Sequence, residues 1–550
     1  MRKQVLIINL NRLGDLIQMT PLLQRLREEL ADVAIDVLVS RPCAPVTALL
    51  PGVRNVYCDD VHAQLGHVSA GTDTTRLIQE VVHWADPFRK VGYDRVINIT
   101  FTRRSGLLAS AIAAPDTRGV LLNCVGAPLV QNPWFVYFAD LLQYRRFNRF
   151  NLVDLFTLGG SGHGTYTPIR LAISMAAEKW ARAEFPSRTN GVARIAVQVG
   201  ASRPEKAWRA ESFGRTMAAI SRRTSVEFIL TGTVGEKNTA QQALRVYKTA
   251  GGKGPIFDST GRTDIEQLAA LLQSCDLLIT NDTGTMHVAI GVGVRVLNIS
   301  VGPVSFWETG PYGENHWVIR ADSVESEVGN HDSIVPEQVA ELAVHLLGRA
   351  PLPSSWTGVQ VYESRLDADG LNQYRQRAGQ CDERAQWYGT FWRKYWYEQF
   401  ERRPSRIALD EPCPDLNEQQ DVFSAISPIA DQLVAHANDL VDLNQRDVSL
   451  SALQPAAKQL ADMHSRLMKI ATPSSAFAPL TIALLRDLHN GDGTTAKQLA
   501  RQHLFAYRTF RDRARSVIER LTDVCAEASF WKEKGVRNHS LTCVADGAPR

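Results

Sequence analysis

Short apolar runs alternate with helically spaced segments along residues 1–350, and this alternation constrains the fold more than any other feature. Residues 4–10 form an apolar run, residues 16–30 place leucines at helical spacing, and residues 34–39 are apolar again. Runs of this length are typical of buried strands, and the spacing between them predicts amphipathic helices. The opening of the chain therefore predicts a βαβ unit in a parallel sheet.

A second series of the same kind follows in the sequence. Its apolar runs are residues 195–199, 226–230, 276–280 and 294–300, with helical segments between them. Two Rossmann-like domains that face a cleft are predicted, and ligands of such sheets lie beyond the carboxyl ends of the strands. We place these domains at residues 1–165 and 166–350.

The pattern changes after residue 350. Prolines and serines at residues 351–355 indicate a linker, which we extend to residues 351–372. Residues 373–550 then show mainly helical spacing. The predicted fold class is α/β with two Rossmann-like domains, followed by a C-terminal, mainly α-helical domain.

Composition narrows the class of protein. A chain of 550 residues is too long for one core, and its net charge of +3 leaves no electrostatic footprint for nucleic acid. The eight cysteines include no Cys-x-x-Cys pair, which favours reduced thiols over a disulfide framework or a zinc site. The apolar runs are strand-sized and the N-terminus lacks a signal-peptide pattern, so we expect a cytoplasmic protein.

A small polar motif at residues 281–284 indicates a phosphate site. Asp282, Thr283 and Gly284 follow an apolar run and precede a helical stretch from Thr285. The first N–H groups of a helix lack intrahelical partners, and a glycine lets an anion approach them closely. His287 lies one turn further on, on the same face as Thr283. An ordinary capped turn is the alternative interpretation.

A second motif follows the first predicted strand. Gly14 permits a tight turn there, and Asp15 opens the next helix, so that its carboxylate faces the cleft. In a sugar transfer to a hydroxyl, a base must take the hydroxyl proton, and one well-placed aspartate is sufficient. A simple N-cap is the other interpretation of Asp15.

Two further loops carry charges at strand ends. Arg203 and Lys206 follow the strand that opens the second domain, where a lysine would supply a point charge for a pyrophosphate. Thr231 and Gly232 precede Glu236, which is placed to accept hydrogen bonds from ribose hydroxyls. A solvated basic loop and an ordinary helix cap remain the alternatives.

Taken together, these segments resemble glycosyltransferase family 9, the ADP-heptose:lipopolysaccharide heptosyltransferases, which have the GT-B fold. The resemblance covers roughly residues 3–348. The motifs that carry it are Arg12-Leu13-Gly14-Asp15 with Thr20-Pro21, Gly200-Ala201-Ser202 with Lys206 and Trp208, Asn281-Asp282-Thr283-Gly284 with His287, and Gly302-Pro303 with Thr309-Gly310-Pro311-Tyr312-Gly313.

The resemblance implies inverting, metal-independent transfer of a heptose from an ADP-sugar to a hydroxyl of a lipopolysaccharide-type acceptor. No cofactor is implied beyond the nucleotide sugar itself, and the glycolipid or glycan acceptor places the protein in the cytoplasm or peripherally at the inner membrane. The implied roles are Asp15 as general base; Arg12 and Gly14 on the acceptor side; Lys206, Asp282, Thr283, Gly284, Thr285 and His287 for the donor and its diphosphate; and Thr231, Gly232 and Glu236 for the nucleotide.

Three departures from the family keep other functions open. Position 285 is Thr where the family usually has Pro, the segment 305–307 is less polar than usual, and the extension from residue 351 is absent from plain core enzymes. The acceptor could therefore be a protein or another surface glycan. A non-catalytic nucleotide-sugar-binding scaffold and a GT-B epimerase or phosphorylase are the alternatives from other classes.

Three remaining features have more ordinary interpretations. An aromatic stripe at residues 387–400 is typical of a packed helix face, with acceptor docking as the alternative. Residues 134–156 interleave aromatic and basic side chains, which suits either a membrane surface or a bridge between the two domains. Asp367 and Asp369 resemble a metal-binding Asp-x-Asp, but they lie away from the other motifs, and we reject that interpretation.

Overall fold

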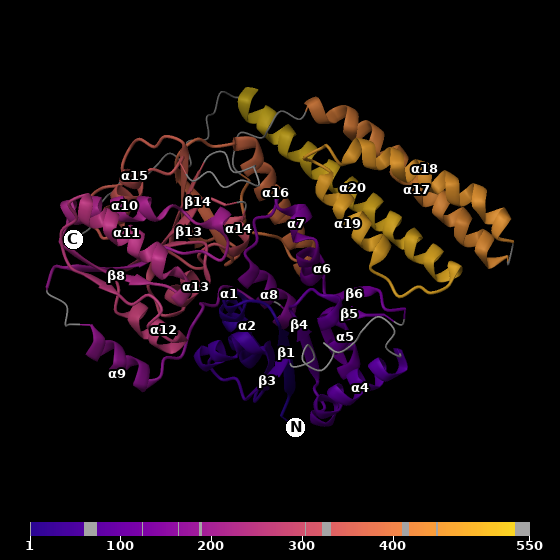
Figure 1. The fold of residues 1–550 in the computed structure, drawn as a ribbon. Helices are drawn as coiled ribbons and strands as arrows, with labels where there is room; N and C mark the ends of the chain where they lie inside the picture. Colours follow the sequence, from indigo (N-terminus) through magenta and orange to yellow (C-terminus); the bar gives the residue numbers. More distant parts are fainter. Residues whose placement is uncertain are drawn as a thin grey trace. The chain divides into compact units, whose positions relative to one another are not determined.

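The computed structural model describes residues 2–59, 74–123, 125–162, 164–185, 190–302, 304–321, 332–409, 417–446 and 449–533 (Figure 1). The chain divides into two compact units. We call the first the α/β unit, which comprises Met1–Leu141, Asn148–Asp382 and Trp396–Ile407. The second is the helical unit, which comprises Leu142–Phe147, Glu383–Tyr395 and Ala408–Arg550.

The first sheet of the α/β unit has the strand order β3-β2-β1-β4-β5-β6. Its strands are β1 (Gln4–Asn9), β2 (Ala34–Ser40), β3 (Asn55–Asp59), β4 (Arg95–Asn98), β5 (Asp116–Leu122) and β6 (Pro128–Gln131). All neighbours pair in parallel except β6, which runs antiparallel to β5. The associated helices are α1 (Leu13–Gln18), α2 (Thr20–Glu29), η1 (Arg41–Leu49), α4 (Thr74–Val91), α5 (Arg103–Ile112), α6 (Pro133–Ala139) and α8 (Leu152–Ser161), whereas most of α7 (Leu141–Tyr144) belongs to the helical unit.

The second sheet has the strand order β14-β13-β12-β11-β10-β7-β8-β9. Its strands are β7 (Ala193–Gln198), β8 (Val226–Thr231), β9 (Ile256–Asp258), β10 (Leu277–Asn281), β11 (Arg295–Ser300), β12 (Trp317–Ala321), β13 (Val359–Leu366) and β14 (Asn372–Ala378). Its helices are α9 (Met175–Glu184), η2 (Pro204–Lys206), α10 (Ala210–Arg223), η3 (Val234–Glu236), α11 (Lys237–Thr249), α12 (Ile265–Gln273), α13 (Gly284–Gly291), α14 (Phe306–Thr309) and α15 (Pro336–Leu346).

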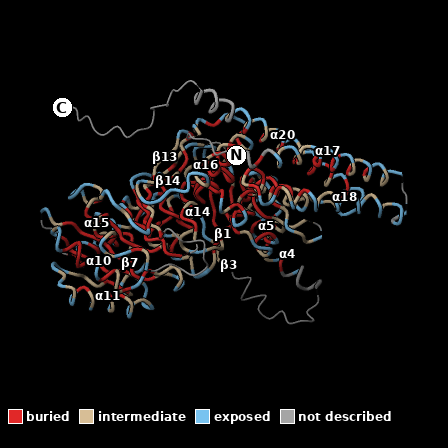
Figure 2. Tube along the Cα trace, turned by 90° about the horizontal axis from the view of Figure 1, so that it is seen from above, coloured by how far each residue is buried: buried red, intermediate tan, exposed pale blue. Residues whose placement is uncertain are grey.

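Burial explains why the apolar runs form the central strands. Every residue of β7, β8 and β10 is buried, as a parallel sheet covered on both faces requires. Figure 2 shows buried residues along strands such as β1 and β7, whereas α11 carries many exposed residues. The predicted α/β class with two Rossmann-like halves is confirmed.

The predicted linker at residues 351–372 is wrong in its second half. Strand β13 runs antiparallel to β12, and β14 runs antiparallel to β13, so the second sheet continues through residue 378. The prolines and serines at 351–355 mark only a short loop. Val359 and Val361 are fully buried in the sheet core, and this alternation of apolar residues is the strand signal that the linker interpretation overlooked.

The two halves of the α/β unit are joined through helix α8. The carboxylate of Asp154, which is buried, accepts hydrogen bonds from the Tyr312 hydroxyl at 2.9 Å and from the Asn372 backbone N–H at 3.0 Å. The side-chain amide of Asn151 donates to the Gly310 carbonyl at 3.4 Å. The end of the basic and aromatic segment 134–156 therefore bridges the two sheets, as one of its two interpretations predicts.

Replacing Asp154 with alanine is expected to lower the free energy of unfolding by about 3 kcal/mol, because a buried hydroxyl and a buried N–H lose their acceptor. Urea unfolding monitored by circular dichroism measures this difference. Asp86→Ala is the control, since Asp86 lies on α4 with its side chain 46% exposed. Equal stability of the two variants would contradict the bridging role of Asp154.

The helical unit is built mainly from four helices, which are α17 (Asn417–Gln445), α18 (Leu450–Ala471), α19 (Ala478–His489) and α20 (Ala496–Glu533). Helix α17 packs against α18 and α20, and α19 packs against α20 (Figure 1). The first part of α16 (Glu383–Glu401) completes the unit. The predicted C-terminal helical domain is confirmed, but its predicted start at residue 373 is wrong, because residues 372–378 form β14 and the helices begin with α16 at Glu383. Among the described residues, none of the helices combines the length and the hydropathy that a membrane span requires.

The aromatic stripe of α16 is packed. Trp387, Tyr388, Phe391, Trp392 and Tyr395 are all buried in the helical unit. The Trp392 indole N–H donates to a backbone carbonyl at 3.0 Å, and the Trp387 and Phe391 rings stack with centroids 5.5 Å apart. These contacts support the interpretation of the stripe as core.

Cysteine chemistry is consistent with reduced thiols where the structure describes it. Cys43, Cys58, Cys275 and Cys381 form no disulfide. Cysteines 124, 413 and 543 lie outside the described residues, and the side chain of Cys525 is not described either.

Candidate active site

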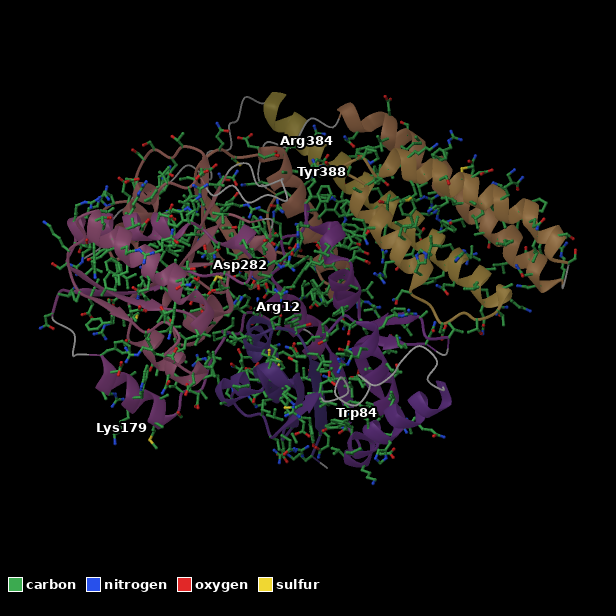
Figure 3. The ribbon with its side chains drawn as sticks, in the orientation of Figure 1. Arg12, Trp84, Lys179, Asp282, Arg384 and Tyr388 are labelled. Carbon is green, nitrogen blue, oxygen red and sulfur yellow. The ribbon has the colours of Figure 1, made fainter. Side chains whose placement is uncertain are left out.

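The first turns of α1 and α13, one from each sheet, meet at two glycines. A Cβ built on Gly14 would lie 3.7 Å from the Gly284 Cα and 3.1 Å from the His287 Cδ2. A Cβ on Gly284 would lie 2.6 Å from the Leu13 Cδ2, closer than real contacts allow. Glycine at both positions therefore lets the two predicted motifs approach each other. Figure 3 labels Arg12 and Asp282, which flank this contact.

Asp15 lies at the start of α1 and is partly buried. Its Oδ2 accepts the backbone N–H of Arg12 at 3.1 Å, so it does take part in capping the helix. Burial raises its pKa above 3.8, the hydrogen bond and charge of Arg12 oppose that rise, and the charge of Asp282 adds to it. A carboxylate with a raised pKa is a stronger base, so capping and proton acceptance are compatible in Asp15.

Asp282 and Lys206 form an ion pair at the carboxyl ends of β10 and β7. The Lys206 Nζ lies 3.5 Å from the Asp282 Oδ2, and each side chain is 17% exposed. Burial raises the pKa of Asp282, and the charge of Lys206 opposes that rise. A Cβ on Gly302 would lie 3.2 Å from the Lys206 Cα, so this glycine lets the loop after β11 close on Lys206. Pro303, the other half of that predicted motif, lies outside the described residues.

Asn281 connects the two donor-side loops, a role that the sequence interpretation missed. Its buried side-chain amide donates to the carbonyls of Val199 at 2.9 Å and Gly200 at 3.0 Å. Its Oδ1 accepts the backbone N–H of Trp208 at 2.9 Å. The loop that carries Lys206 is thereby fixed to the turn that carries Asp282. The signal available in the sequence was Asn281 itself, a polar residue at the end of an apolar run.

Glu236 lies across the carboxyl ends of β7 and β8. Its Oε2 accepts the backbone N–H of Thr233 at 2.6 Å and the Thr233 hydroxyl at 2.9 Å. A Cβ on Gly200 would lie 1.7 Å from the Glu236 Oε1, and a Cβ on Gly232 would lie 2.8 Å from its Oε2. The carboxylate therefore occupies space that only glycines leave open. Thr231, the last residue of β8, is buried.

The remaining donor-side residues lie in the first turns of α13. The hydroxyls of Thr283 and Thr280 are 3.1 Å apart, and the Thr285 hydroxyl donates to the Gln198 Oε1 at 3.3 Å. His287 is buried, and its Nδ1 has no hydrogen-bond partner among the described residues. Burial lowers the pKa of His287 to about 4, so its ring is neutral near pH 7 and can serve a ligand only as a neutral group.

An open groove of 1180 Å³ lies elsewhere on the α/β unit. It is lined by Ala193, Asp276 and Arg295, which mark the amino ends of β7, β10 and β11. None of the predicted site residues lines this groove. Ligands of such sheets bind at the carboxyl ends of the strands, so the groove is not the predicted site.

Asp367 and Asp369 hold a turn together. The Asp367 Oδ1 accepts the N–H groups of Asp369 at 2.9 Å and Leu371 at 3.0 Å. The Asp369 Oδ1 accepts the Arg406 N–H at 2.8 Å. Their carboxylates thus have structural partners. In the described part of the chain, no three His, Cys, Asp or Glu side chains form a group that could hold a metal ion.

Comparisons with known proteins bear on the family resemblance and on the fold. Residues 85–334 match the model of glycosyltransferase family 9 (heptosyltransferase). Lipopolysaccharide heptosyltransferase 3 of Escherichia coli (strain K12) is 24% identical over 307 residues, which are 55% of this chain and 83% of that protein. A solved glycosyltransferase family 9 structure from Veillonella parvula is 23% identical with a TM-score of 0.50, covering 63% of this chain and 98% of its own. The solved ADP-heptose lipopolysaccharide heptosyltransferase II of E. coli is 18% identical with a TM-score of 0.47, and the match covers 63% of this chain and 99% of that protein.

These findings confirm the resemblance to family 9 and the prediction of a glycosyltransferase. The likeness to the Veillonella structure supports the GT-B type of fold. The family match includes Lys206, Glu236 and Asp282, whereas Asp15 precedes it and the helical extension follows it. The roles of the individual site residues stay predictions, which the variants below test.

Proposed function

We propose that this glycosyltransferase, whose residues 85–334 form a family 9 region, transfers a heptose from an ADP-sugar to a hydroxyl of a lipopolysaccharide-type acceptor. One observation carries the proposal. The contact of α1 with α13 brings the Asp15 carboxylate of one domain close enough to the Asp282 motif of the other for their charges to interact. A base and a diphosphate cradle on facing helix N-termini suit a transfer between two bound substrates.

In the proposed reaction, Asp15 takes the proton of the acceptor hydroxyl as its oxygen attacks the anomeric carbon. The attack comes from the face opposite the diphosphate, so the configuration inverts and the bond to ADP breaks. The charge that develops on ADP is balanced by Lys206 and by the free N–H groups that begin α13. These groups require no metal ion and no cofactor beyond the nucleotide sugar.

The other residues divide between the two substrates. Glu236, beside Thr231 and Gly232, accepts ribose hydroxyls of the nucleotide. The diphosphate and the donor sugar are contacted by Thr283, Gly284, Thr285 and the neutral His287. Asp282 contacts the hydroxyls of the sugar. Arg12 and Gly14 face the acceptor.

Purified protein incubated with ADP-heptose and a heptose-deficient lipopolysaccharide tests the proposal. We expect ADP release that depends on the acceptor, together with a product whose mass is larger by one heptose. Thermal shifts with a panel of nucleotide sugars test the donor, because a ligand that binds the folded state raises its melting temperature. A shift by non-ADP donors only would overturn the heptose assignment.

The same assay separates the alternatives. Acceptor-independent conversion of the sugar would indicate an epimerase or phosphorylase, and donor binding without any turnover would indicate a scaffold. Transfer to a protein or to another surface glycan, with none to lipopolysaccharide, would retain the chemistry and change the acceptor. We place the activity in the cytoplasm, with peripheral attachment to the inner membrane as the setting for a glycolipid acceptor.

A further inference from the structure

Gln198 is the last residue of β7, and no part of the proposed mechanism uses it. It is buried, with 3% of its surface exposed, in a strand that is otherwise mostly apolar. A buried side-chain amide is costly unless both its donor and its acceptor find partners. Those partners show what Gln198 does.

Both ends of the Gln198 amide contact predicted donor-side residues. Its Nε2 donates to the Glu236 Oε1 and Oε2, each at 3.1 Å. Its Oε1 accepts the hydroxyl proton of Thr285 at 3.3 Å. The orientation of the amide follows from this chemistry, because a carboxylate only accepts and so must face the amide nitrogen.

The two sets of hydrogen bonds form a relay from Thr285 through Gln198 to Glu236. This relay depends on a departure from the family pattern. Position 285 carries a threonine where the family usually has a proline, and proline has no hydroxyl to give the Gln198 oxygen a donor. Thr285 therefore supplies the donor for the Gln198 oxygen, while the Glu236 carboxylate fixes which way the amide points. The chain Thr285–Gln198–Glu236 is a property of this sequence, and it joins the first turn of α13 to the carboxylate at the end of β8.

The hydrogen bonds of Glu236 show which atom is left for a ligand. Its Oε2 already accepts two hydrogen bonds from Thr233 in addition to Gln198. In the described part of the chain, Gln198 is the only donor that reaches Oε1. Since a carboxylate oxygen has two lone pairs, Oε1 keeps one for a hydroxyl of the ligand.

We propose that Gln198 is a positioning residue for nucleotide binding: it aims the Oε1 of Glu236 at the ribose and couples that contact to Thr285 beside the diphosphate. The inference rests on the proposed function, and specifically on a nucleoside diphosphate as the donor. Gln198 touches no reacting atom, so its loss weakens donor binding and leaves the chemical step largely intact.

Calorimetric titration of the full-length protein with ADP tests this inference. Gln198→Leu keeps the approximate volume of the side chain and removes its hydrogen bonds to Thr285 and Glu236. We expect the Kd for ADP to rise about tenfold and the KM for the donor to rise in parallel. We expect kcat to fall less than threefold. Gln242→Leu is the matched control, since Gln242 also donates to a glutamate, Glu211 at 2.5 Å, between α10 and α11. We expect that variant to bind ADP like the wild type.

A double-mutant cycle separates positioning from a general effect on folding. If Gln198 acts through Glu236, then adding Gln198→Leu to Glu236→Ala changes the Kd for ADP less than twofold. A full tenfold loss in the Glu236→Ala background would overturn the inference. Thr285→Val should bind ADP more weakly than Thr285→Ser when Gln198 is present, and equally when Gln198 is leucine.

The outcomes distinguish this inference from the proposed function. A wild-type protein that binds neither ADP nor ADP-heptose contradicts the proposed function itself. A wild-type protein that binds ADP and transfers sugar, with a Gln198→Leu variant of unchanged Kd, contradicts only the role of Gln198. Thermal unfolding of each variant confirms that the protein is folded at the assay temperature.

Discussion

Replacing Asp15 with asparagine is expected to lower kcat for sugar transfer by about 10³-fold, because asparagine cannot take the proton of the acceptor hydroxyl. Asparagine keeps the size of the side chain and an oxygen that can accept the Arg12 N–H. Binding of ADP should therefore persist, since the donor motif lies on the other domain. Rates of ADP release with saturating donor and acceptor, compared with calorimetric ADP binding, measure the two effects separately.

Asp94→Asn is the matched control for Asp15→Asn. Asp94 also accepts a backbone N–H, that of Gln4 at 2.8 Å, but at the opposite end of β1. We expect this variant to transfer sugar at the wild-type rate. An Asp15→Asn enzyme that retains more than a tenth of the wild-type kcat would remove Asp15 as the base.

Asp15 should also influence how kcat/KM and thermal stability depend on pH. Its pKa is raised above 3.8, chiefly by burial, so the acidic limb of kcat/KM should lie above the pH at which an ordinary aspartate titrates. The folded protein holds the Asp15 proton more tightly than the unfolded chain does. This contribution to stability is present at low pH and is lost as the pH rises through the raised pKa. Asp15→Asn should therefore raise Tm at pH 7 and not below pH 3.8.

Replacing Lys206 with alanine is expected to lower kcat/KM for the donor by about 10²- to 10³-fold, the range found when one preorganised charge or donor is removed from a transition state. Lys206 is the cation paired with Asp282, and it reaches the turn where the diphosphate is proposed to bind. Its loss has a second consequence. Asp282 keeps its burial and loses the charge that lowers its pKa, so that pKa should rise further.

Arg203→Ala in the same loop provides the comparison for Lys206→Ala. Arg203 is 58% exposed and pairs only loosely with Glu205, at 3.7 Å, so we expect less than a threefold change in kcat/KM. Steady-state kinetics at varied ADP-heptose measures both variants. A larger effect for Arg203→Ala than for Lys206→Ala would contradict the prediction, because it would indicate that Arg203 and not Lys206 contacts the phosphate.

The sequence was sufficient where a local pattern carries the information. Apolar runs and helical spacing predicted the two Rossmann-like halves, because burial on both faces of a parallel sheet demands such runs. Strand ends followed by glycine and polar residues located Asp15, Lys206, Glu236 and Asp282. The same local reasoning missed β13 and β14, since the prolines at 351–355 indicated a linker and the pairing of β13 with β12 and β14 is a tertiary contact.

What the sequence alone determined is which residue types lie at the ends of the strands, and hence the fold class and the resemblance to family 9. Only the tertiary structure decided which of them meet. Gly14 faces Gly284 across the two domains, Asn281 ties two loops together, and Gln198 joins Glu236 to Thr285. Strand order, register and the packing of the two sheets set these contacts, and no local pattern encodes a partner 38 or more residues away.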